Sequence, residues 1–288
     1  MYVITGITGK VGGAVARALL NKNLPVRGVI RDASKAAFWQ EQGCDIAIAD
    51  MFDVKALTEA FKGATAVFIL PPSDFDPAPG FPQARIVINA VSDAIKAALP
   101  EKVVCLSTIG AQAEENNLLT QRGLMEQALQ EVGVPVTFLR PGWFMENCAL
   151  DVASARDTGV IHSYLQPLDK AVPMIATADV GQLAANLLVE EWQGNRVVEL
   201  EGPHRVSPND IVNTFAQILG RPVVAEVVAR ETWDEVFRAQ GHQYPLPRSR
   251  MIDGFNEGWI CFERPKTERV IGETELVTVL TGLLQNNQ

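Results

Sequence analysis

Short runs of apolar residues, many of them β-branched, recur through the first half of the chain and alternate with stretches that have helical spacing. Between the first two runs, Val11, Val15, Ala18 and Leu19 repeat so that they form one apolar stripe on a helix. The runs predict six strands with five helices between them, at residues 3–5, 25–30, 45–48, 66–70, 102–106 and 135–139.

Strands that alternate with crossover helices form a parallel sheet with helices on both faces, and right-handed crossovers favour the doubly wound order. After Arg140 the periodicity loosens, although a helix at 180–188 and a strand at 196–200 continue the alternation. The sequence therefore predicts an α/β protein with a Rossmann-type doubly wound parallel sheet and a smaller C-terminal substrate-binding lobe. We assign residues 1–142 to the Rossmann domain, with 178–202 returning to it, and residues 143–177 and 203–288 to the lobe.

A proline-rich segment with the sequence PPSDFDPAPGFP, residues 71–82, follows the fourth predicted strand. It lies at the carboxyl edge of the predicted sheet, which is where sheets of this kind bind ligands. A loop of this length is either a lid over a ligand or a structural connection, and its residues favour neither role.

The composition narrows the classes of partner. The chain has 288 residues, of which 47% are apolar and 20% are charged, and its formal net charge is -9. This balance disfavours nucleic acid and anionic membranes as partners. No apolar run approaches the roughly 18–20 residues that span a bilayer, and the first strand begins too early to leave room for a signal peptide. We expect a cytoplasmic protein.

The first predicted strand leads into a glycine-rich turn, and a helix begins at about Lys10. In such a turn the first glycine allows the tight bend, the second keeps side chains away from a pyrophosphate, and the third lets helix and strand pack closely. Backbone N–H groups at a helix start bind phosphate whatever the net charge of the protein. The turn predicts a site for the pyrophosphate of a dinucleotide, formed by Gly6, Thr8, Gly9, Lys10, Val11 and Gly12.

The end of the second predicted strand indicates which dinucleotide binds. An NAD-binding protein would present an acid to the ribose diol there, whereas this chain has Arg31, with Lys35 one helical turn further on. A guanidinium pairs with a 2′-phosphate in a planar two-bond geometry, so these residues favour NADP(H) over NAD(H). Asp32 weakens this preference, because an acid at this place suits a ribose diol, although an aspartate at a helix start is also a common N-cap. Asp50, after the third strand, either accepts a hydrogen bond from the adenine amino group or is a solvated turn residue.

Several segments resemble the NmrA-like family of atypical short-chain dehydrogenases/reductases. They are TGITGKVGG at 5–13, VIRDASK at 29–35, AD at 49–50, LSTIGA at 106–111 and GVPVTFLRPGWFMEN at 133–147. The last is the most specific, because related quinone and triphenylmethane reductases carry a similar Leu-Arg-x-x-x-aromatic stretch. The resemblance implies that NADP(H) lies along the carboxyl edge, with substrate in a cleft against the second lobe. It implies that the nicotinamide is bordered by Leu70, Pro71, Ser107, Pro141 and Trp143.

The chain departs from ordinary short-chain dehydrogenases in its chemistry. Those enzymes use Tyr-x-x-x-Lys, in which the lysine lowers the pKa of the tyrosine so that it exchanges a proton with the substrate oxygen. No tyrosine of this chain has a lysine four residues later, and helix 120–126 lacks the lysine or histidine that some family reductases carry there. Weak candidates for polarising an acceptor oxygen are Ser107, Thr108 and Arg122, which are otherwise read as strand-end and helix-surface residues.

Two functions fit this pattern. In the first, the protein is a reductase whose small-molecule acceptor, such as a quinone or an azo or cationic dye, takes hydride without a dedicated acid. In the second, it resembles the redox-sensing regulators of the family, which bind dinucleotide and act through a protein partner with little or no catalysis. The sequence is compatible with a monomer or a homodimer in either case.

Other chemistry receives little support. The four cysteines have no paired spacing and are expected to be buried, reduced thiols, and the three histidines lie about forty residues apart, which argues against a metal site. Six aromatic side chains either wall a flat substrate pocket or belong to the core. They are Trp143, Phe144, Trp233, Phe237, Trp259 and Phe262.

Overall fold

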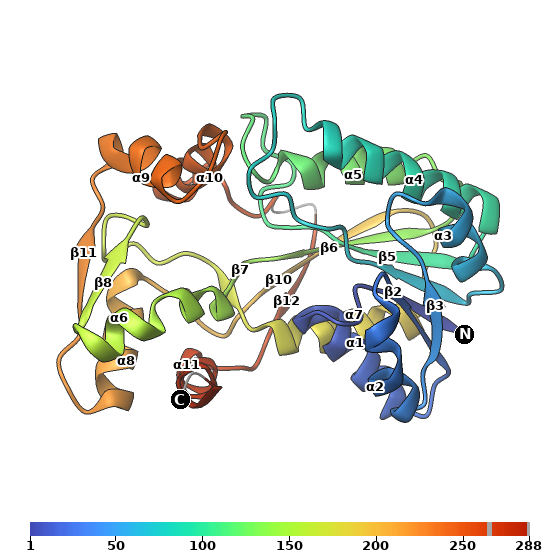
Figure 1. Ribbon diagram of the computed structural model, residues 1–288, viewed down its shortest axis with the longest axis horizontal. Coiled ribbons are helices and arrows are strands. Elements are labelled where there is room, and N and C mark those ends of the chain that lie inside the picture. Colours follow the sequence, from blue (N-terminus) through green and yellow to red (C-terminus); the bar gives the residue numbers. More distant parts are fainter. Residues whose placement is uncertain (264–266, 287–288) are drawn as a thin grey trace.

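A computed structural model describes residues 1–263 and 267–286 of the chain. Its central feature is an eight-stranded sheet in which every neighbouring pair is parallel, in the order β12-β10-β6-β5-β4-β1-β2-β3 (Figure 1). The order reverses between β1 and β4, as in a doubly wound fold. The strands are β1 (Tyr2–Thr5), β2 (Val26–Ile30), β3 (Asp45–Ile48), β4 (Ala66–Ile69), β5 (Lys102–Leu106), β6 (Val136–Pro141), β10 (Arg196–Glu201) and β12 (Glu268–Ile271). The expected Rossmann-type fold is confirmed.

Helices cover both faces of this sheet, and the alternation of side chains along each strand explains why. On β1, Ile4 joins a buried cluster that includes helices on one face, whereas Val3 joins a separate cluster on the other. The first face is covered by α1 (Lys10–Leu20), α2 (Ala36–Glu41) and α7 (Thr177–Val189). The second face is covered by α3 (Val54–Phe61), α4 (Pro82–Ala98) and α5 (Thr120–Leu129).

The edge strand β12 was not predicted from the sequence. Three of its four residues are exposed, so it carries no apolar pattern, and it pairs with β10 through backbone hydrogen bonds. It lies within 203–288, which the expected division assigned wholly to the lobe, so Glu268–Ile271 belong to the large sheet instead. The remainder of that domain division stays a prediction.

A smaller lobe with its own core stands beside the sheet (Figure 1). Trp233 and Phe237 are fully buried at its centre and Phe262 is buried nearby, so these three aromatics belong to the core. Two short parallel pairs, β8 with β11 and β7 with β9, complete the strands. The lobe contains β7 (Trp143–Phe144), α6 (Val152–Asp157), β8 (Val160–Ser163), β9 (Met174–Ile175), α8 (Pro208–Leu219), β11 (Val224–Val227), α9 (Trp233–Ala239), α10 (Leu246–Glu257) and α11 (Leu276–Asn286). Short 3-10 turns lie at Ala33–Lys35, Met145–Leu150 and Arg230–Thr232.

Helices α1 and α7 lie side by side on one face of the sheet, and their contact is unusually close. A Cβ atom added at Gly181 would overlap the Cβ atom of Ala14, so α7 approaches α1 at a distance that only glycine allows. Gly181 is in the second turn of α7 and Ala14 is in the second turn of α1, so the two helices begin close together. None of the helices in the described residues has the length and hydropathy needed to cross a membrane.

This contact yields a stability prediction. Replacing Gly181 with alanine should destabilise the protein by roughly 1–3 kcal/mol, because the added methyl group overpacks the α1–α7 contact. The matched control is Gly282→Ala in α11, where an added Cβ meets nothing within 4 Å and alanine should be neutral or slightly stabilising. Urea unfolding of both variants measures the effect, and equal free energies of unfolding would show that the contact imposes no constraint.

Candidate functional site

The glycine-rich turn lies where β1 ends and α1 begins, at the point where the strand order reverses. Gly6 has a φ of +64°, and its carbonyl accepts a hydrogen bond from the Gly9 N–H at 2.9 Å. A Cβ atom at Gly12 would overlap the Gly6 carbonyl oxygen. The fold itself therefore requires glycine at both positions, one for the bend and one for close packing of the helix on the turn.

Gly9 differs from these two glycines. Its backbone is extended, with φ of −90° and ψ of 173°, and a Cβ atom there would only touch the Gly6 carbonyl oxygen at 3.4 Å. The protein alone therefore accommodates a side chain at Gly9. Glycine at this position is explained if a ligand comes close to the backbone, as a pyrophosphate does in this type of turn. The cradle thus fits a dinucleotide.

The N-terminus of α1 is electrostatically suited to an anion. Gly9 is its N-cap and supplies no side-chain hydrogen bond, and no acidic residue lies in the first turn. The backbone N–H groups at the helix start and the positive end of its dipole are therefore available to a phosphate. Thr8, Gly9 and Lys10 are exposed around it, whereas Val11 is buried and holds the helix on the sheet.

The neighbouring helix α7 begins beside α1, but its N-terminus is filled by the protein itself. One carboxylate oxygen of Glu146 accepts hydrogen bonds from the Thr177 backbone N–H at 2.8 Å and from the Thr177 hydroxyl at 2.6 Å. A carboxylate in this place satisfies the helix N-terminus and repels a second anion. Sequence reasoning missed Glu146, because 31 residues separate it from Thr177.

Strands β1 and β4 are joined at the reversal point by one buried hydroxyl. The Thr5 hydroxyl donates to the Phe68 carbonyl at 3.1 Å and accepts from the Leu70 N–H at 2.8 Å. This arrangement brings the Leu70 side chain next to Gly6, since an added Cβ at Gly6 would meet it at 3.3 Å. The end of β4 and the glycine turn therefore form one continuous surface, which continues into the buried Pro71.

The residues expected to select the cofactor lie at the ends of β2 and β3. Arg31 and Lys35 are exposed, and neither side chain makes a hydrogen bond or ion pair with the described part of the chain. The Asp32 carboxylate accepts the Ser34 N–H at 3.0 Å, and its hydrogen bonds with Ser34 lower the pKa of Asp32, so it is the expected N-cap. The Asp50 carboxylate accepts the Phe52 N–H at 3.2 Å, and its hydrogen bond with the adenine amino group stays a prediction.

Ser107, at the end of β5, belongs to a buried charged network that the sequence did not predict. Its hydroxyl donates to Glu126 of α5, and Glu126 pairs with Arg140 of β6 through two hydrogen bonds of 2.9 and 2.6 Å. Arg140 also binds Glu263 at 2.7 Å. Burial alone would lower the pKa of the Arg140 guanidinium, but the two carboxylates raise it overall, so the network stays charged.

Two of the three candidates for polarising an acceptor oxygen already donate hydrogen bonds within the protein. The Ser107 proton is directed at Glu126, so the hydroxyl does not offer it to an acceptor oxygen. Arg122 donates to the Pro71 carbonyl at 3.1 Å and to the Ser73 hydroxyl at 2.9 Å, so it holds the proline-rich segment. Thr108 is half-buried, and its backbone carbonyl accepts the Ala111 N–H.

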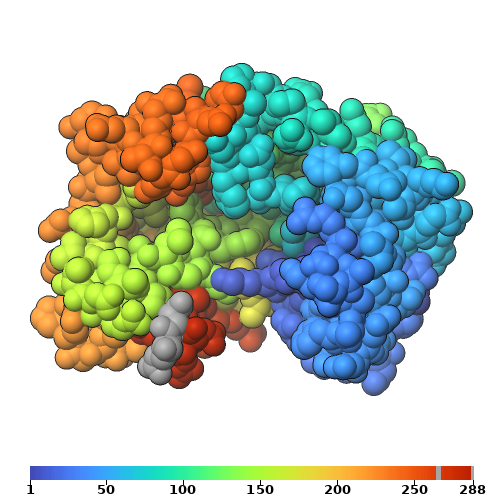
Figure 2. Space-filling view, in the orientation of Figure 1, coloured from blue at the N-terminus to red at the C-terminus, as the bar shows by residue number. Residues whose placement is uncertain are grey.

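Pro141 and Trp143 lie where the sheet meets the lobe. The Pro141 carbonyl accepts the Ile109 N–H at 2.9 Å, which joins the ends of β5 and β6. The half-buried Trp143 ring packs edge-on against Phe255 of α10, with ring centroids 5.0 Å apart. On the face shown in Figure 2, the surface is hollowed where blue residues of the N-terminal half meet yellow-green residues of the lobe.

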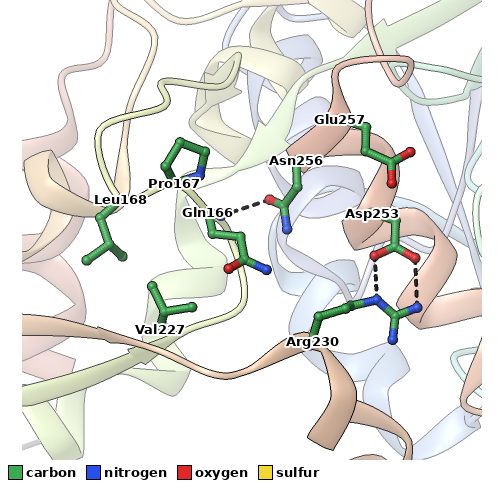
Figure 3. Close-up of a pocket in the computed structure, with 8 residues that line it drawn as sticks. All are labelled: Gln166, Pro167, Leu168, Val227, Arg230, Asp253, Asn256 and Glu257. Atoms are coloured by element: carbon green, nitrogen blue, oxygen red, sulfur yellow. Dashed lines mark hydrogen bonds and ion pairs between the residues drawn. The ribbon is translucent and has the colours of Figure 1, made fainter.

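A separate pocket of about 660 Å³ opens in the lobe (Figure 3). Most of its polar groups are paired with one another or with their surroundings. Arg230 binds Asp253 through two bonds of 2.6 and 2.8 Å, and the Asn256 side chain accepts the Gln166 N–H at 2.9 Å. None of the residues predicted for the cofactor or for catalysis lines it; the lining comprises Gln166, Pro167, Leu168, Val227, Arg230, Asp253, Asn256 and Glu257.

The cysteines differ in part from the expectation. Cys44, Cys105 and Cys148 are buried, and burial raises the pKa of the Cys105 and Cys148 thiols to about 12, so these two are unreactive. Cys261 is exposed, which corrects the expectation that all four are buried. It lies between the buried Ile260 and Phe262 in the irregular segment that follows α10. Within residues 1–263 and 267–286, no three side chains of His, Cys, Asp or Glu are grouped as metal ligands.

The parallel sheet, its reversal point and the open helix start after a glycine turn define a Rossmann-type protein. Residues 2–254 match the model of the NmrA-like family, and the chain belongs to that family. The expected resemblance is confirmed.

Two relatives by sequence and two solved structures show what the chain is similar to. The chain is 28% identical over 285 residues to an NAD(P)H azoreductase of Xenophilus azovorans, covering 98% of this chain and 93% of that protein. It is 30% identical over 244 residues to Quinone oxidoreductase 2 of Escherichia coli strain K12, covering 84% and 82%. Among solved structures, the Escherichia coli NADPH-dependent quinone oxidoreductase complexed with NADPH superposes with a TM-score of 0.80 at 22% identity, covering 98% and 99%. The Citrobacter sp. triphenylmethane reductase complexed with NADP(H) gives 0.78 at 17%, covering 100% and 99%.

The geometry of the turn leads to a prediction for Gly9. Because its φ and ψ suit a β-branched residue and an added Cβ lies only at contact distance from the Gly6 carbonyl oxygen, Gly9→Val should fold, with a loss of stability of about 1 kcal/mol for the poorer N-cap residue. The isopropyl group should instead occupy the space of the pyrophosphate and weaken NADPH and NADH binding alike, by roughly 1–3 kcal/mol. A fluorescence titration with each cofactor, together with a thermal unfolding curve, checks both points. Unchanged affinities for both cofactors would contradict the prediction that the pyrophosphate binds at this turn.

Proposed function

We propose that the protein is an NADPH-dependent reductase that transfers hydride to a quinone-like or other electron-poor small acceptor. The observation that carries this proposal is the open N-terminus of α1 at Gly9. Arg31 and Lys35, which follow the neighbouring strand β2, add exposed cationic side chains that make no hydrogen bond or ion pair in the described residues. The family relatives that are named azoreductase and quinone oxidoreductase support the reaction class.

The preference for NADP(H) is inferred from charge at the end of β2. A 2′-phosphate brings negative charge to this place, whereas the ribose diol of NAD(H) does not. Arg31 and Lys35 are exposed at that strand end, and the neighbouring Asp32 is engaged with the Ser34 backbone. A guanidinium that is not already paired is available to form charged hydrogen bonds with a phosphate.

Bound NADPH would supply a hydride at its nicotinamide ring. The residues around the expected nicotinamide position do not provide an evident acid, because Ser107 donates to Glu126 and Arg122 donates to backbone carbonyls. The protein would therefore hold the two reactants in contact and exclude water with apolar groups such as Leu70 and Trp143, while protons come from solvent. Acceptors whose own electron deficiency drives hydride transfer suit such a site.

The test is NADPH oxidation by the purified protein with a panel of quinones and azo dyes, beside a binding titration of NADPH. Saturable turnover with at least one acceptor is the expected result. NADPH binding without turnover on any of them would contradict the reductase proposal while leaving the cofactor site in place. Absence of NADPH binding would contradict both.

Arg31→Ala tests the cofactor preference. We expect NADPH binding to weaken by roughly 1–3 kcal/mol through the loss of charged hydrogen bonds, while NADH binding changes little. Isothermal titration calorimetry with each cofactor gives the two affinities. Lys96→Ala, which removes an exposed charge from α4 on the other side of the sheet, is the control for a general charge effect. Equal losses for both cofactors would exclude Arg31 from the selection.

A further inference from the structure

Residues 71–81 of the proline-rich segment, hereafter the strap, connect two parts of the molecule, and Pro82 begins α4. The strap starts at the end of β4, where Leu70 contacts Gly6 of the glycine turn, and it ends at Phe81, the N-cap of α4. Its middle reaches the lobe, where it contacts the turn at residues 242–244 that precedes α10. The strap therefore runs from the expected cofactor edge to the second lobe.

The first half of the strap is fixed to α5 through its backbone. Arg122 donates to the carbonyls of Pro71 and Pro72, and the Gln121 side chain donates to the carbonyl of Asp74 at 2.9 Å. Gln121 is buried, so this contact is sheltered from water. This half of the strap is part of the sheet side of the molecule.

The second contact is a clasp made by a single side chain. The two carboxylate oxygens of Asp76 accept the backbone N–H groups of Gln243 and Tyr244, each at 2.7 Å. Burial alone would raise the pKa of the Asp76 carboxyl, but these two donors and the nearby His242 lower it below its ordinary value. The Asp76 carboxyl is therefore ionised at neutral pH, and the clasp loses its charged acceptor as the pH falls through the lowered pKa of Asp76.

The lobe holds its side of the clasp in place. One ring nitrogen of His242 lies 3.7 Å from the Asp76 carboxylate, and the other lies 3.0 Å from the Arg248 guanidinium. An arginine only donates, so the nitrogen facing it must accept. The Arg248 guanidinium in turn lies over the ring of the buried Phe237, 4.6 Å from its centroid. The turn at 242–244 is thus anchored to the lobe core.

The strap is a stiff segment with a strained bend at one end. Prolines at positions 71, 72, 77 and 79 fix φ at four of its residues. At its far end two consecutive residues, Gly80 and Phe81, have positive φ values of 80° and 57°. Positive φ is rare for a bulky residue such as Phe81, so the backbone is held in a strained bend there.

We propose that the strap closes over the carboxyl edge beside the glycine turn, and that the Asp76 clasp must release for a ligand at that edge to enter or leave. Asp76 acts here as a positioning residue, because it holds the strap and does not touch the reacting atoms. The inference rests on cofactor binding at the glycine turn, as in the proposed function, and does not require turnover.

The experiment compares Asp76→Ala with Asp93→Ala, which removes an exposed carboxylate of α4. Hydrogen exchange reports on the clasp at the amides of Gln243 and Tyr244, and stopped-flow fluorescence gives the association and dissociation rate constants of NADPH. In Asp76→Ala we expect the exchange rates of those two amides to increase by about tenfold, which is the ratio expected for a lost charged hydrogen bond. We expect the association and dissociation rate constants of NADPH to increase by about the same factor. Asp76→Asn, which retains one acceptor oxygen, should lie in between, and Asp93→Ala should match the wild type.

The outcomes distinguish a clasp that controls ligand passage from a static contact. Faster amide exchange with unchanged NADPH rate constants would show that the clasp is a static contact and would overturn the inference, as would unchanged exchange. Exchange of the α1 amides at the wild-type rate confirms that the variant is folded. If the wild type does not bind NADPH, the proposed function fails and this inference fails with it. If the wild type binds NADPH and Asp76→Ala has the same rate constants as the wild type, only this inference fails.

Discussion

The close packing of helix α1 between the glycine turn and helix α7 is the constraint on which the carboxyl edge depends. Gly12 lets the first turn of α1 rest against the Gly6 carbonyl, and Gly181 lets α7 approach from the other side. With α1 fixed in this way, its N-terminus points into the space beside Leu70 at the strand reversal. A ligand site results from packing that leaves backbone donors unused, and no polar side chain has to be introduced to create it.

Charge at this edge leaves the start of α1 open to an anion and occupies the start of α7 beside it. Glu146 neutralises the start of α7, and Glu126 and Arg140 neutralise each other beneath the end of β5. A buried ion pair of this kind contributes little net stability, but removal of either partner would leave an uncompensated charge. The pair ties together β6, α5 and, through Ser107, β5, so the geometry of the edge and its electrostatic balance are maintained by the same residues.

The sequence predicted the features that are encoded locally. The strands and the glycine turn carry their signal within a few neighbouring residues, because burial on both faces demands apolar runs and the turn demands glycine. Strand β12 escaped prediction because it is an exposed edge strand. Glu126, Glu146 and Asp76 escaped because each acts on a residue far away in the chain, and spacing contains no record of such pairs. For the same reason, the sequence does not show that Ser107 donates to Glu126 or that Arg122 donates to Pro71.

The pairing of β12 with β10 also bears on how the protein assembles. The chain leaves the sheet after β10, builds the remainder of the lobe, and returns to add the last edge strand. Pairing of β12 with β10 closes a long loop of chain. The conformational entropy lost on closing it is offset only by contacts between residues far apart in the sequence. During synthesis the sheet therefore stays incomplete at this edge until Glu268–Ile271 have emerged. The two cores are consequently coupled in folding, although each is separately buried in the finished molecule.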